Sequence, residues 1–401
     1  MAKKTLKDLP PLQGKRVLVR VDFNVAHDPK TGAIVNDRRI RAAVPTLKYL
    51  TDAGARVIVM SHFGRPEGDP AKDAIYRLDR IAARLQELLG VRVRKVDEVV
   101  GPGVTAAVET LLPGGVLVLE NLRFHPGEKK NDAYFAQCLA DLGDIYVNEA
   151  FGTCHNAKDA SMIALPQAMA AAGKPRVIGF LVEKELAILD QLLSAPPRPL
   201  VGVLGGAKVS DKIKFIESLL AKVDRLLIGG AMTYTFLKAQ GGGVGNSRFE
   251  HDQLDVAGRL LESGKIVLPT DHVVADRPEA SAATQVVEGP IPDGWLGVDI
   301  GPKTIEQYRR AIAEAGTVVW NGPMGWFELE PFSHGTRAVA EALAASKAVT
   351  IVGGGETAEA VEAFGVADRI KHVSTGGGAF LNYVESGRLP ALDQIEDRKT
   401  P

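Results

Sequence analysis

The chain has 401 residues, of which 45% are hydrophobic and 24% are charged, and its formal net charge is -1. This balance gives no overall field that would favour nucleic acid or an anionic membrane, and no apolar run approaches the ~18 residues of a transmembrane helix. The N-terminal segment lacks the apolar core of a secretory signal, and the only two cysteines are Cys138 and Cys154. We therefore expect a cytoplasmic protein with no nucleic-acid or membrane partner.

Strand-like apolar runs alternate with helical periodicity in the first half of the chain. The predicted strands are 16–21, 55–60, 116–119 and 144–147, and the predicted helices are 40–50, 76–89 and 132–142. Such alternation predicts βαβ units and a mostly parallel sheet with helices on both faces. In sheets of this kind, ligands bind beyond the carboxyl ends of the strands.

The alternation is interrupted between residues 173 and 195, where 183–190 has the pattern of an amphipathic helix that ends before a proline-rich stretch. It then resumes, with predicted strands at 225–228, 265–268, 317–320, 348–352 and 369–373. We predict an α/β fold of two doubly wound, parallel-sheet (Rossmann-like) domains, residues 1–172 and 196–385, joined by a helical hinge, residues 173–195. The tail, 386–401, is too polar to form a core of its own.

A glycine turn joins an apolar strand that begins at Val201 to a predicted helix that begins at Lys212. Gly205 and Gly206 would let the backbone approach phosphate oxygens, and free N–H groups at the helix start would face those oxygens. Lys208 and Lys212 are four residues apart, so we expect them on one face of the first helical turn. Taken alone, the segment favours an ordinary turn with two solvated lysines, because short glycine motifs give many false positives.

Further glycine clusters follow predicted strands in the second half of the chain. Several backbone cradles along one sheet edge favour a nucleotide with its phosphates. The absence of a P-loop and of a Gly-x-Gly-x-x-Gly fingerprint argues against a P-loop protein and a standard dinucleotide fold. The clusters are Gly229–Gly230, Asn321–Gly325, Gly353–Thr357 and Ser374–Gly378.

Polar and basic side chains follow the predicted strands of the first half. If those strands are parallel, their ends meet at one edge and form a basic cluster suited to a small dianionic or trianionic metabolite, because arginine binds phosphate and carboxylate bidentately. Each arginine alone could equally be a solvated surface residue. A zinc site at the histidines 62, 125 and 155 is disfavoured, since nearby arginines would repel a cation. The cluster consists of Asp22, Asn24, Arg39, His62, Arg65 and Arg123.

A series of segments resembles, in order, the motifs of the phosphoglycerate kinase family: RVDFNV at 20–25, SHFGRP at 61–66, LENLRF at 119–124, GGAKVSDK at 205–212, NGPMG at 321–325 and STGGGA at 374–379. The resemblance implies a two-domain, monomeric, cytosolic enzyme of glycolysis. That enzyme would transfer a phosphoryl group reversibly between 1,3-bisphosphoglycerate and ADP, giving 3-phosphoglycerate and Mg-ATP. Residues 386–401 would return to the first domain.

The resemblance also implies roles for individual residues. Phosphoglycerate would be held by Asp22, Phe23, Asn24, Arg39, His62, Phe63, Gly64, Arg65, Arg123 and Asn156. The nucleotide would be held by Gly205, Gly206, Lys208, Lys212, Gly229, Gly230, Asn321, Pro323, Glu328, Gly353, Gly354, Gly355, Glu356 and Thr357, with Glu356 as a ligand of Mg²⁺. Catalysis would depend on Arg39, Lys208, Gly354, Gly355, Gly376, Gly377 and Gly378. Arg39 matches the family's arginine better than Arg38, because it directly precedes the segment 40–43.

The sequence departs from the family pattern at several positions. Asn156 stands where the family has an arginine that contacts substrate, and the loop after it is one residue longer, with Lys158 as a candidate replacement for the missing charge. Glu356 replaces a metal-binding aspartate, and Trp326 and Ala26 are also unusual. These departures leave open a family member that has lost activity and only binds nucleotide. An oxidoreductase on a doubly wound fold is disfavoured by the missing fingerprint.

Overall fold

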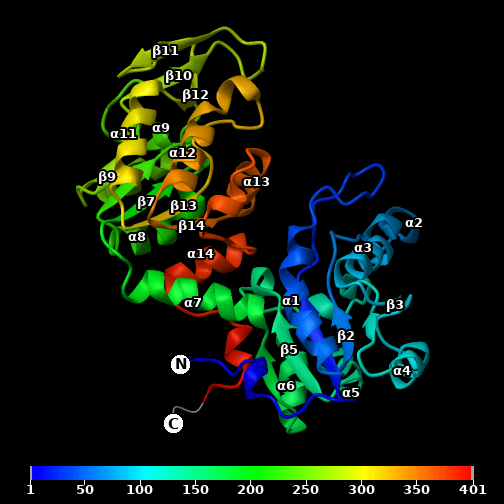
Figure 1. Cartoon of the computed structure of the whole chain (residues 1–401). Helices are drawn as coiled ribbons and strands as arrows, with labels where there is room; N and C mark the ends of the chain where they lie inside the picture. Colours follow the sequence, from blue (N-terminus) through cyan, green and yellow to red (C-terminus); the bar gives the residue numbers. More distant parts are fainter. Residues whose placement is uncertain (1, 399–401) are drawn as a thin grey trace. The chain divides into compact units, whose positions relative to one another are not determined.

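The computed structural model describes residues 2–398. The chain forms two compact units, one containing the residues up to Ala187 and those from Arg388, and the other Ile188–Gly387 (Figure 1). The boundary lies inside helix α7 (Phe180–Ser194). Each unit is built around its own parallel sheet of six strands, which confirms the predicted α/β class.

The sheet of the first unit has the strand order β3-β4-β2-β1-β5-β6, and every neighbouring pair is parallel. Its strands are β1 (Arg16–Val21), β2 (Arg56–Met60), β3 (Val93–Lys95), β4 (Val116–Val118), β5 (Ile145–Glu149) and β6 (Arg176–Ile178). Its helices are α1 (Arg38–Asp52), α2 (Pro70–Asp73), α3 (Asp79–Leu89), α4 (Pro102–Glu109), α5 (Ala133–Asp141) and α6 (Ala164–Ala171). Short 3-10 turns are η1 (Leu6–Asp8), η2 (Ala74–Tyr76), η3 (Leu122–Phe124), η4 (Glu128–Lys130), η5 (Phe151–Thr153) and η10 (Leu392–Gln394).

Hydrophobic periodicity explains these elements. Strand β1 is buried except at its first residue, as expected for a central strand covered on both faces. Helix α1 buries Ile40, Ala43, Leu47 and Leu50, at spacings of three and four residues, against the core of the first unit. The residues that follow β1 and begin α1 are thereby held at the carboxyl edge of the sheet.

The edge strands β3 and β6 were not predicted. Each has three residues and includes basic side chains, so neither shows the apolar run of a buried strand. Strand β6 lies within the segment 173–195, which we predicted to be the helical hinge. The helical part begins only at Phe180, because Arg176–Ile178 pairs with β5 and belongs to the first sheet.

The second unit contains a parallel sheet in the order β15-β14-β13-β7-β8-β9. Its parallel strands are β7 (Leu200–Leu204), β8 (Arg225–Ile228), β9 (Ile266–Val267), β13 (Thr317–Asn321), β14 (Val349–Gly353) and β15 (His372–Val373). Its helices are α8 (Ile213–Leu220), α9 (Met232–Ala239), α10 (Leu254–Leu261), α11 (Pro302–Ala313), α12 (His334–Ala345), α13 (Gly355–Ala363) and α14 (Gly377–Ser386). Its 3-10 turns are η6 (Ser210–Lys212), η7 (His251–Gln253), η8 (Glu330–Phe332) and η9 (Ala367–Arg369).

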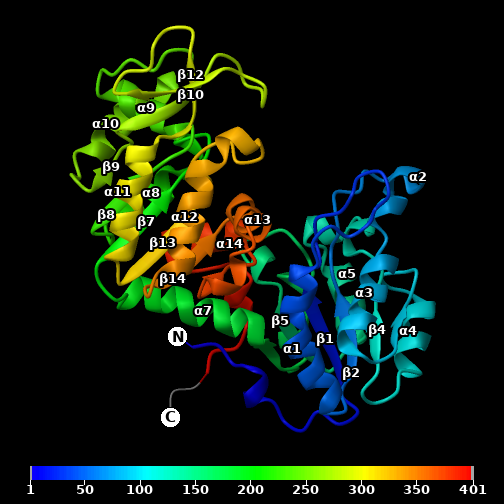
Figure 2. The ribbon, with the colours of Figure 1, turned by 45° about the horizontal axis from the view of Figure 1, so that its top comes forward.

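A separate antiparallel sheet in the second unit was also missed. It has the order β11-β10-β12, formed by β10 (Asp271–Ala275), β11 (Thr284–Glu288) and β12 (Leu296–Ile300). It lies at one end of this unit with α9 (Figure 1, Figure 2). Strand β11 is largely exposed and polar, so its sequence has no buried strand signature.

The C-terminal segment packs within the first unit. The Lys4 amide donates to the Glu396 carbonyl at 2.8 Å, and the Arg176 amide donates to the Glu396 carboxylate at 3.0 Å. Leu392 and Ile395 are buried. The edge of the first sheet at β6 is therefore covered by residues from the end of the chain.

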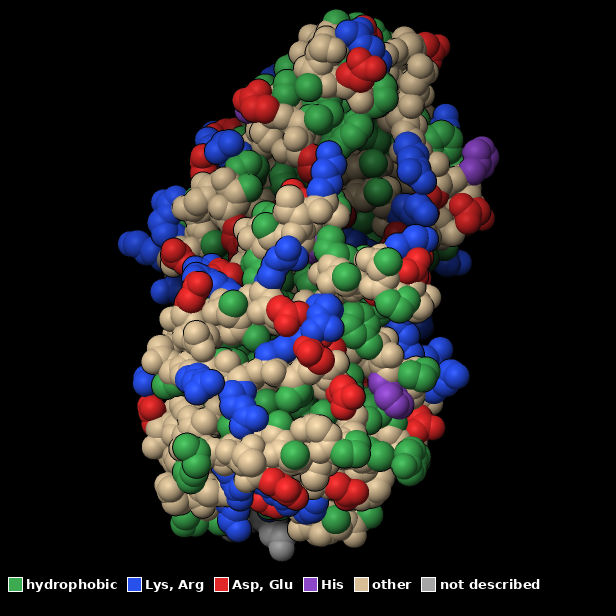
Figure 3. Space-filling model, turned by 90° about the vertical axis from the view of Figure 1, so that its right-hand side faces the viewer, with side chains coloured by type: hydrophobic (Ala, Val, Ile, Leu, Met, Phe, Trp, Pro, Cys, Tyr) green, Lys and Arg blue, Asp and Glu red, His purple; other side chains and the backbone are tan. Residues whose placement is uncertain are grey.

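None of the helices among residues 2–398 combines the length and the apolar content needed to cross a bilayer. On the face shown in Figure 3, basic and acidic side chains are interspersed. This mixture agrees with the near-zero net charge of the sequence.

Candidate active site

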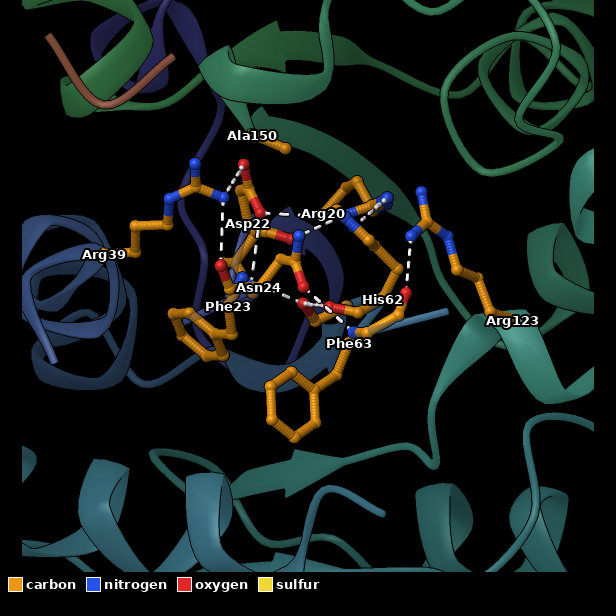
Figure 4. A network of polar contacts seen from close by, with 12 residues as sticks. Arg20, Asp22, Phe23, Asn24, Arg39, His62, Phe63, Arg123 and Ala150 are labelled. Carbon is orange, nitrogen blue, oxygen red and sulfur yellow. Dashed lines mark hydrogen bonds and ion pairs between the residues drawn. The ribbon is translucent and has the colours of Figure 1, made fainter. Parts of the chain in front are cut away.

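The carboxyl edge of the first sheet carries a connected polar cluster (Figure 4). Asp22 and Asn24 follow β1, and Arg39 lies in the first turn of α1. Nη1 of Arg39 donates to Oδ2 of Asp22 at 2.9 Å and to the carbonyl of Asn24 at 3.1 Å. Burial raises the pKa of Asp22, but the charges of the nearby Arg39 and Arg20 outweigh it and hold that pKa below its usual value.

The loops after β2 and β4 complete this cluster. The Gly64 amide donates to Oδ1 of Asn24 at 2.9 Å, and Nη1 of Arg123 donates to the Gly64 carbonyl at 2.6 Å. Nε of Arg123 is buried and has no hydrogen-bond partner. Arg65 is exposed and makes no hydrogen bond or ion pair within residues 2–398, so its guanidinium is available to a ligand.

A buried arginine that we did not single out orients His62. Nη2 of Arg20 lies 3.1 Å from Nδ1 of His62, and the Arg20 side chain is fully buried. A guanidinium can only donate, so Nδ1 accepts and the ring proton of the neutral imidazole resides on Nε2. Nε2 lies 3.9 Å from Oδ1 of Asp22. The available sequence signal was a charged residue in the middle of the apolar strand β1.

Burial, together with the charges of Arg20 and Arg123, lowers the pKa of His62 to about 3 despite the opposing charge of Asp22. Because the unfolded histidine titrates near ~6.5, the unfolded state binds more protons than the folded state between these values, and stability falls as pH falls below ~6.5. The contribution is at most ~1.4 kcal/mol per pH unit.

Urea unfolding at pH 7 and pH 5 should show that acid lowers the free energy of unfolding less for His62→Gln than for the parent. Exposed His334 supplies the control variant His334→Gln. An unchanged pH dependence in His62→Gln would contradict the assignment.

Phe23 and Phe63 do not present their rings to the cluster. Both rings belong to the hydrophobic core of the first unit. Phe63 packs edge-to-face against His27 and Tyr76, with ring centroids 4.9 Å and 5.9 Å away. Any contribution of these two residues to substrate binding would therefore come from their backbone. The rings anchor the loops that carry Asn24 and Gly64.

The loop after β5 uses Asn156 to stabilise its own turn. The Asn156 amide donates to the Thr153 carbonyl at 2.9 Å, and Oδ1 of Asn156 accepts from the Lys158 amide at 2.8 Å. Lys158 is exposed, and its ammonium makes no ion pair among the described residues. The Asn156 side chain thus retains only its NH₂ group as a free donor, while Lys158 remains free to bind an anion.

The histidines do not gather into a metal site. His125 stacks on Phe135 with centroids 4.0 Å apart, and its Nδ1 accepts from the Gly127 amide. Within residues 2–398, no group of three or more His, Cys, Asp or Glu side chains is placed to hold a metal ion.

Two lysines follow β7 in the second unit, and they differ in whether their ammonium groups have hydrogen-bond partners. Nζ of Lys212 donates to the Gly205 carbonyl at 2.8 Å, and burial lowers the pKa of Lys212 to about 8 although the nearby Glu356 charge opposes the shift. Lys208 is half-buried, and its ammonium forms no hydrogen bond or ion pair in residues 2–398. Lys208 is therefore the free cation of this loop.

The predicted geometry of this loop needs correction. Helix α8 begins at Ile213, so Lys208 precedes the helix and does not share a helical face with Lys212. The amides of Gly205 and Gly206 donate to the carbonyls of Asn321 and Pro323, at 2.9 Å and 3.1 Å. The amides of Val209 and Ser210 donate to a glutamate carboxylate. Among the residues from Gly205 to Ser210, the backbone N–H groups that remain unpaired are those of Ala207 and Lys208.

Close backbone packing explains the first glycine clusters. A Cβ on Gly205 would clash with the Pro323 carbonyl, and a Cβ on Gly230, whose φ is +67°, would clash with the backbone of Gly206. The loops after β7, β8 and β13 are thus packed backbone against backbone, which only glycine permits. These glycines shape the loops, in contrast to the direct phosphate cradle that we predicted there.

The last two glycine clusters begin helices α13 and α14. Gly354 and Gly376 are their N-caps, and neither helix start is capped by a side chain. A Cβ on Gly377 would lie 3.2 Å from the Cα of Gly354, so the two helix starts are adjacent. Adjacent N-termini present several N–H groups and two positive dipole ends to one anion.

Two residues that we expect to bind nucleotide also hold these loops together. Nδ2 of Asn321 donates to the Gly353 carbonyl at 2.9 Å, and Oγ1 of Thr357 accepts from the Gly322 amide at 2.6 Å. Both side chains are buried, and Thr357 is completely so. The Thr357 hydroxyl still has its own proton to donate, so its predicted contact with nucleotide stays a prediction. Glu328 and Glu356 are exposed, as a ligand contact requires.

Comparison with known proteins identifies the family. The family model for phosphoglycerate kinase matches residues 6–387. The phosphoglycerate kinase of Rubrobacter xylanophilus is 52% identical over 402 residues, covering 100% of both chains, and that of Moorella thermoacetica is 52% identical over 404 residues, covering 99% of this chain and 100% of the relative. A phosphoglycerate kinase structure from Coxiella burnetii matches with a TM-score of 0.84 and 38% identity, covering 98% of this chain and 99% of the other. The chain therefore belongs to the phosphoglycerate kinase family.

Proposed function

We propose that the first unit binds 3-phosphoglycerate or 1,3-bisphosphoglycerate, that the second binds ATP or ADP, and that the enzyme transfers a phosphoryl group between them. The supporting observation is that each unit carries its own set of groups able to bind an anion. A cluster with Arg39, Arg65 and Arg123 lies at the edge of one sheet, and free lysine and helix starts lie at the edge of the other.

A coupled assay with purified protein, Mg-ATP and 3-phosphoglycerate tests this directly. Turnover is expected. Nucleotide binding without turnover would favour the alternative of a family member that has lost activity.

The chemistry needs positioning and charge more than proton transfer. A carboxylate attacks, or an acyl phosphate is attacked, in an in-line displacement, and neither reaction requires a general base. The low pKa of His62 agrees with this, because a neutral imidazole donates a hydrogen bond through Nε2 without exchanging a proton. We assign Lys208 to the transferring phosphoryl group and Lys212 to the nucleotide phosphates.

Enzymes of this family use a magnesium–nucleotide complex, and the residues present fit such a complex. Mg²⁺ is usually bound by one or two carboxylates together with substrate phosphates. Glu356 offers one exposed carboxylate in the first turn of α13. Glu356 would hold the metal, which would supply charge neutralisation for the phosphates.

Glu356→Asp should change the apparent Mg²⁺ or Mn²⁺ requirement more than the affinity for 3-phosphoglycerate. The reason is that magnesium tolerates little departure from ~2.0–2.1 Å octahedral coordination, and aspartate is one methylene shorter. Titrating activity with each metal measures the effect. Glu359→Asp, on the next turn of the same helix, is the exposed control. Identical metal responses in the parent and Glu356→Asp would show that Glu356 is not a ligand.

Lys158 should replace the charge that Asn156 lacks. Lys158→Ala is expected to weaken 3-phosphoglycerate binding by about 1–3 kcal/mol, the range for a hydrogen bond to a charged group, and Asn156→Arg in that background should restore it. Calorimetric titration gives both values, with Lys130→Ala as an exposed control in the same unit. If Lys158→Ala binds like the parent, the site works with less charge than its relatives.

We also propose, from the resemblance alone, that α7 acts as a hinge between the units when both substrates are bound. A monomeric state and a cytoplasmic location have the same basis.

A further inference from the structure

The carboxylate of Glu250, outside all the motifs, holds the loop that carries Lys208. Oε2 of Glu250 accepts hydrogen bonds from the Val209 amide at 2.6 Å and from the Ser210 amide at 3.1 Å, and Oε1 accepts from Oγ of Ser210 at 2.5 Å. The two segments are about forty residues apart in sequence, so this contact is made by the tertiary fold. Three donors on one carboxylate form a strong, charge-assisted clamp.

The backbone of Glu250 is itself held in place by a hydrogen bond to a neighbouring helix. It lies between α9 and α10, and its amide donates to Oγ1 of Thr235 at 3.1 Å. Thr235 is a buried residue of α9. The backbone position from which the carboxylate projects is therefore hydrogen-bonded to α9, the helix that follows the loop after β8.

The loop that carries Lys208 is also fixed at its N-terminal end, by other hydrogen bonds. The Gly206 amide donates to the Pro323 carbonyl, and the Gly206 carbonyl accepts from the Met232 amide at 3.0 Å. Only Ala207 and Lys208 lie between this anchor and the clamp at Val209. A two-residue span held at both ends leaves Lys208 little backbone freedom, while its ammonium and amide have no partner among residues 2–398.

We propose that Glu250 is a positioning residue for phosphoryl transfer, acting through Lys208. It fixes the backbone at Val209 and Ser210, which sets the direction from which the Lys208 side chain leaves the loop. The Glu250 carboxylate also accepts hydrogen bonds from the amides at the start of η6. An incoming phosphate is therefore left with the unpaired amides of Ala207 and Lys208 and with the Lys208 ammonium. This inference rests on the proposed role of Lys208.

A double-mutant cycle tests the proposal. We expect Glu250→Ala to lower kcat about ten-fold or more, because misplacing a catalytic group by about 1 Å can cost ~100-fold, while KM for 3-phosphoglycerate stays within about two-fold. Glu250→Gln keeps one acceptor oxygen and should lose less. The charge control is Asp252→Asn, an exposed acid in the same segment that makes no hydrogen bond or ion pair with the loop among residues 2–398.

The decisive comparison is made in the Lys208→Ala background. If Glu250 acts through Lys208, adding Glu250→Ala to Lys208→Ala causes no further loss of kcat. If the two losses multiply, the positioning role is wrong even though Lys208 is catalytic. A near-normal kcat for Lys208→Ala alone would remove the role of Lys208 and this inference with it. Should Glu250→Ala fail to fold, the cycle with Glu250→Gln decides by the same criterion.

Discussion

Replacement of Lys208 by alanine should lower kcat by at least ~100-fold, the loss expected for a positioned transition-state donor. Its ammonium has no partner among residues 2–398, so its charge is available when the phosphoryl group is in transfer. Nucleotide affinity should change much less, since Lys212 and the two helix starts remain.

Steady-state kinetics and nucleotide titration on the same preparation separate the two effects. Lys214→Ala, an exposed lysine in α8, is the matched control and should behave like the parent. A Lys208→Ala enzyme with a nearly normal kcat would exclude the proposed role.

Arg39→Ala should weaken 3-phosphoglycerate binding about 100-fold, within the ~2–5 kcal/mol found when one partner of a buried charge pair is removed. Two losses would add: the proposed bidentate contact of Arg39 with the substrate, and the counter-charge of Asp22, which is only 8% exposed. Calorimetric titration measures the affinity.

Arg38→Ala is an unusually close control, because Arg38 is the neighbouring residue in the first turn of the same helix. It should leave 3-phosphoglycerate affinity within a few-fold of the parent. If Arg38→Ala has the larger effect, the alignment that selected Arg39 is off by one residue.

Most of the architecture could be predicted because it depends on local periodicity. The central strand 16–21 coincides with β1, and the glycine clusters do lie at the ends of β8, β13, β14 and β15. The missed elements include the short edge strands β3 and β6 and the exposed strand β11, whose residues are too few or too polar to give a buried pattern. The strands β10 and β12 and the short helices α2, α4 and α6 were also missed.

The site was predictable in its residue types but not in its hydrogen bonds. The backbone at Gly205 and Gly206 was expected to approach phosphate oxygens, yet the two amides pair with the carbonyls of Asn321 and Pro323 at the end of β13. Arg20 lies in a motif but was given no role, Glu250 lies outside every motif, and their contacts form only when segments distant in sequence meet. Such partners follow from tertiary packing, on which local propensity carries no information.

Crossed calorimetric titration of Arg39→Ala and Lys212→Ala, with 3-phosphoglycerate and with ADP, tests whether each unit holds one substrate. We expect Arg39→Ala to lose affinity for 3-phosphoglycerate and to keep its affinity for ADP, and Lys212→Ala to show the reverse. Weakening of both ligands to a similar extent in either variant, with the fold intact by circular dichroism, would contradict it.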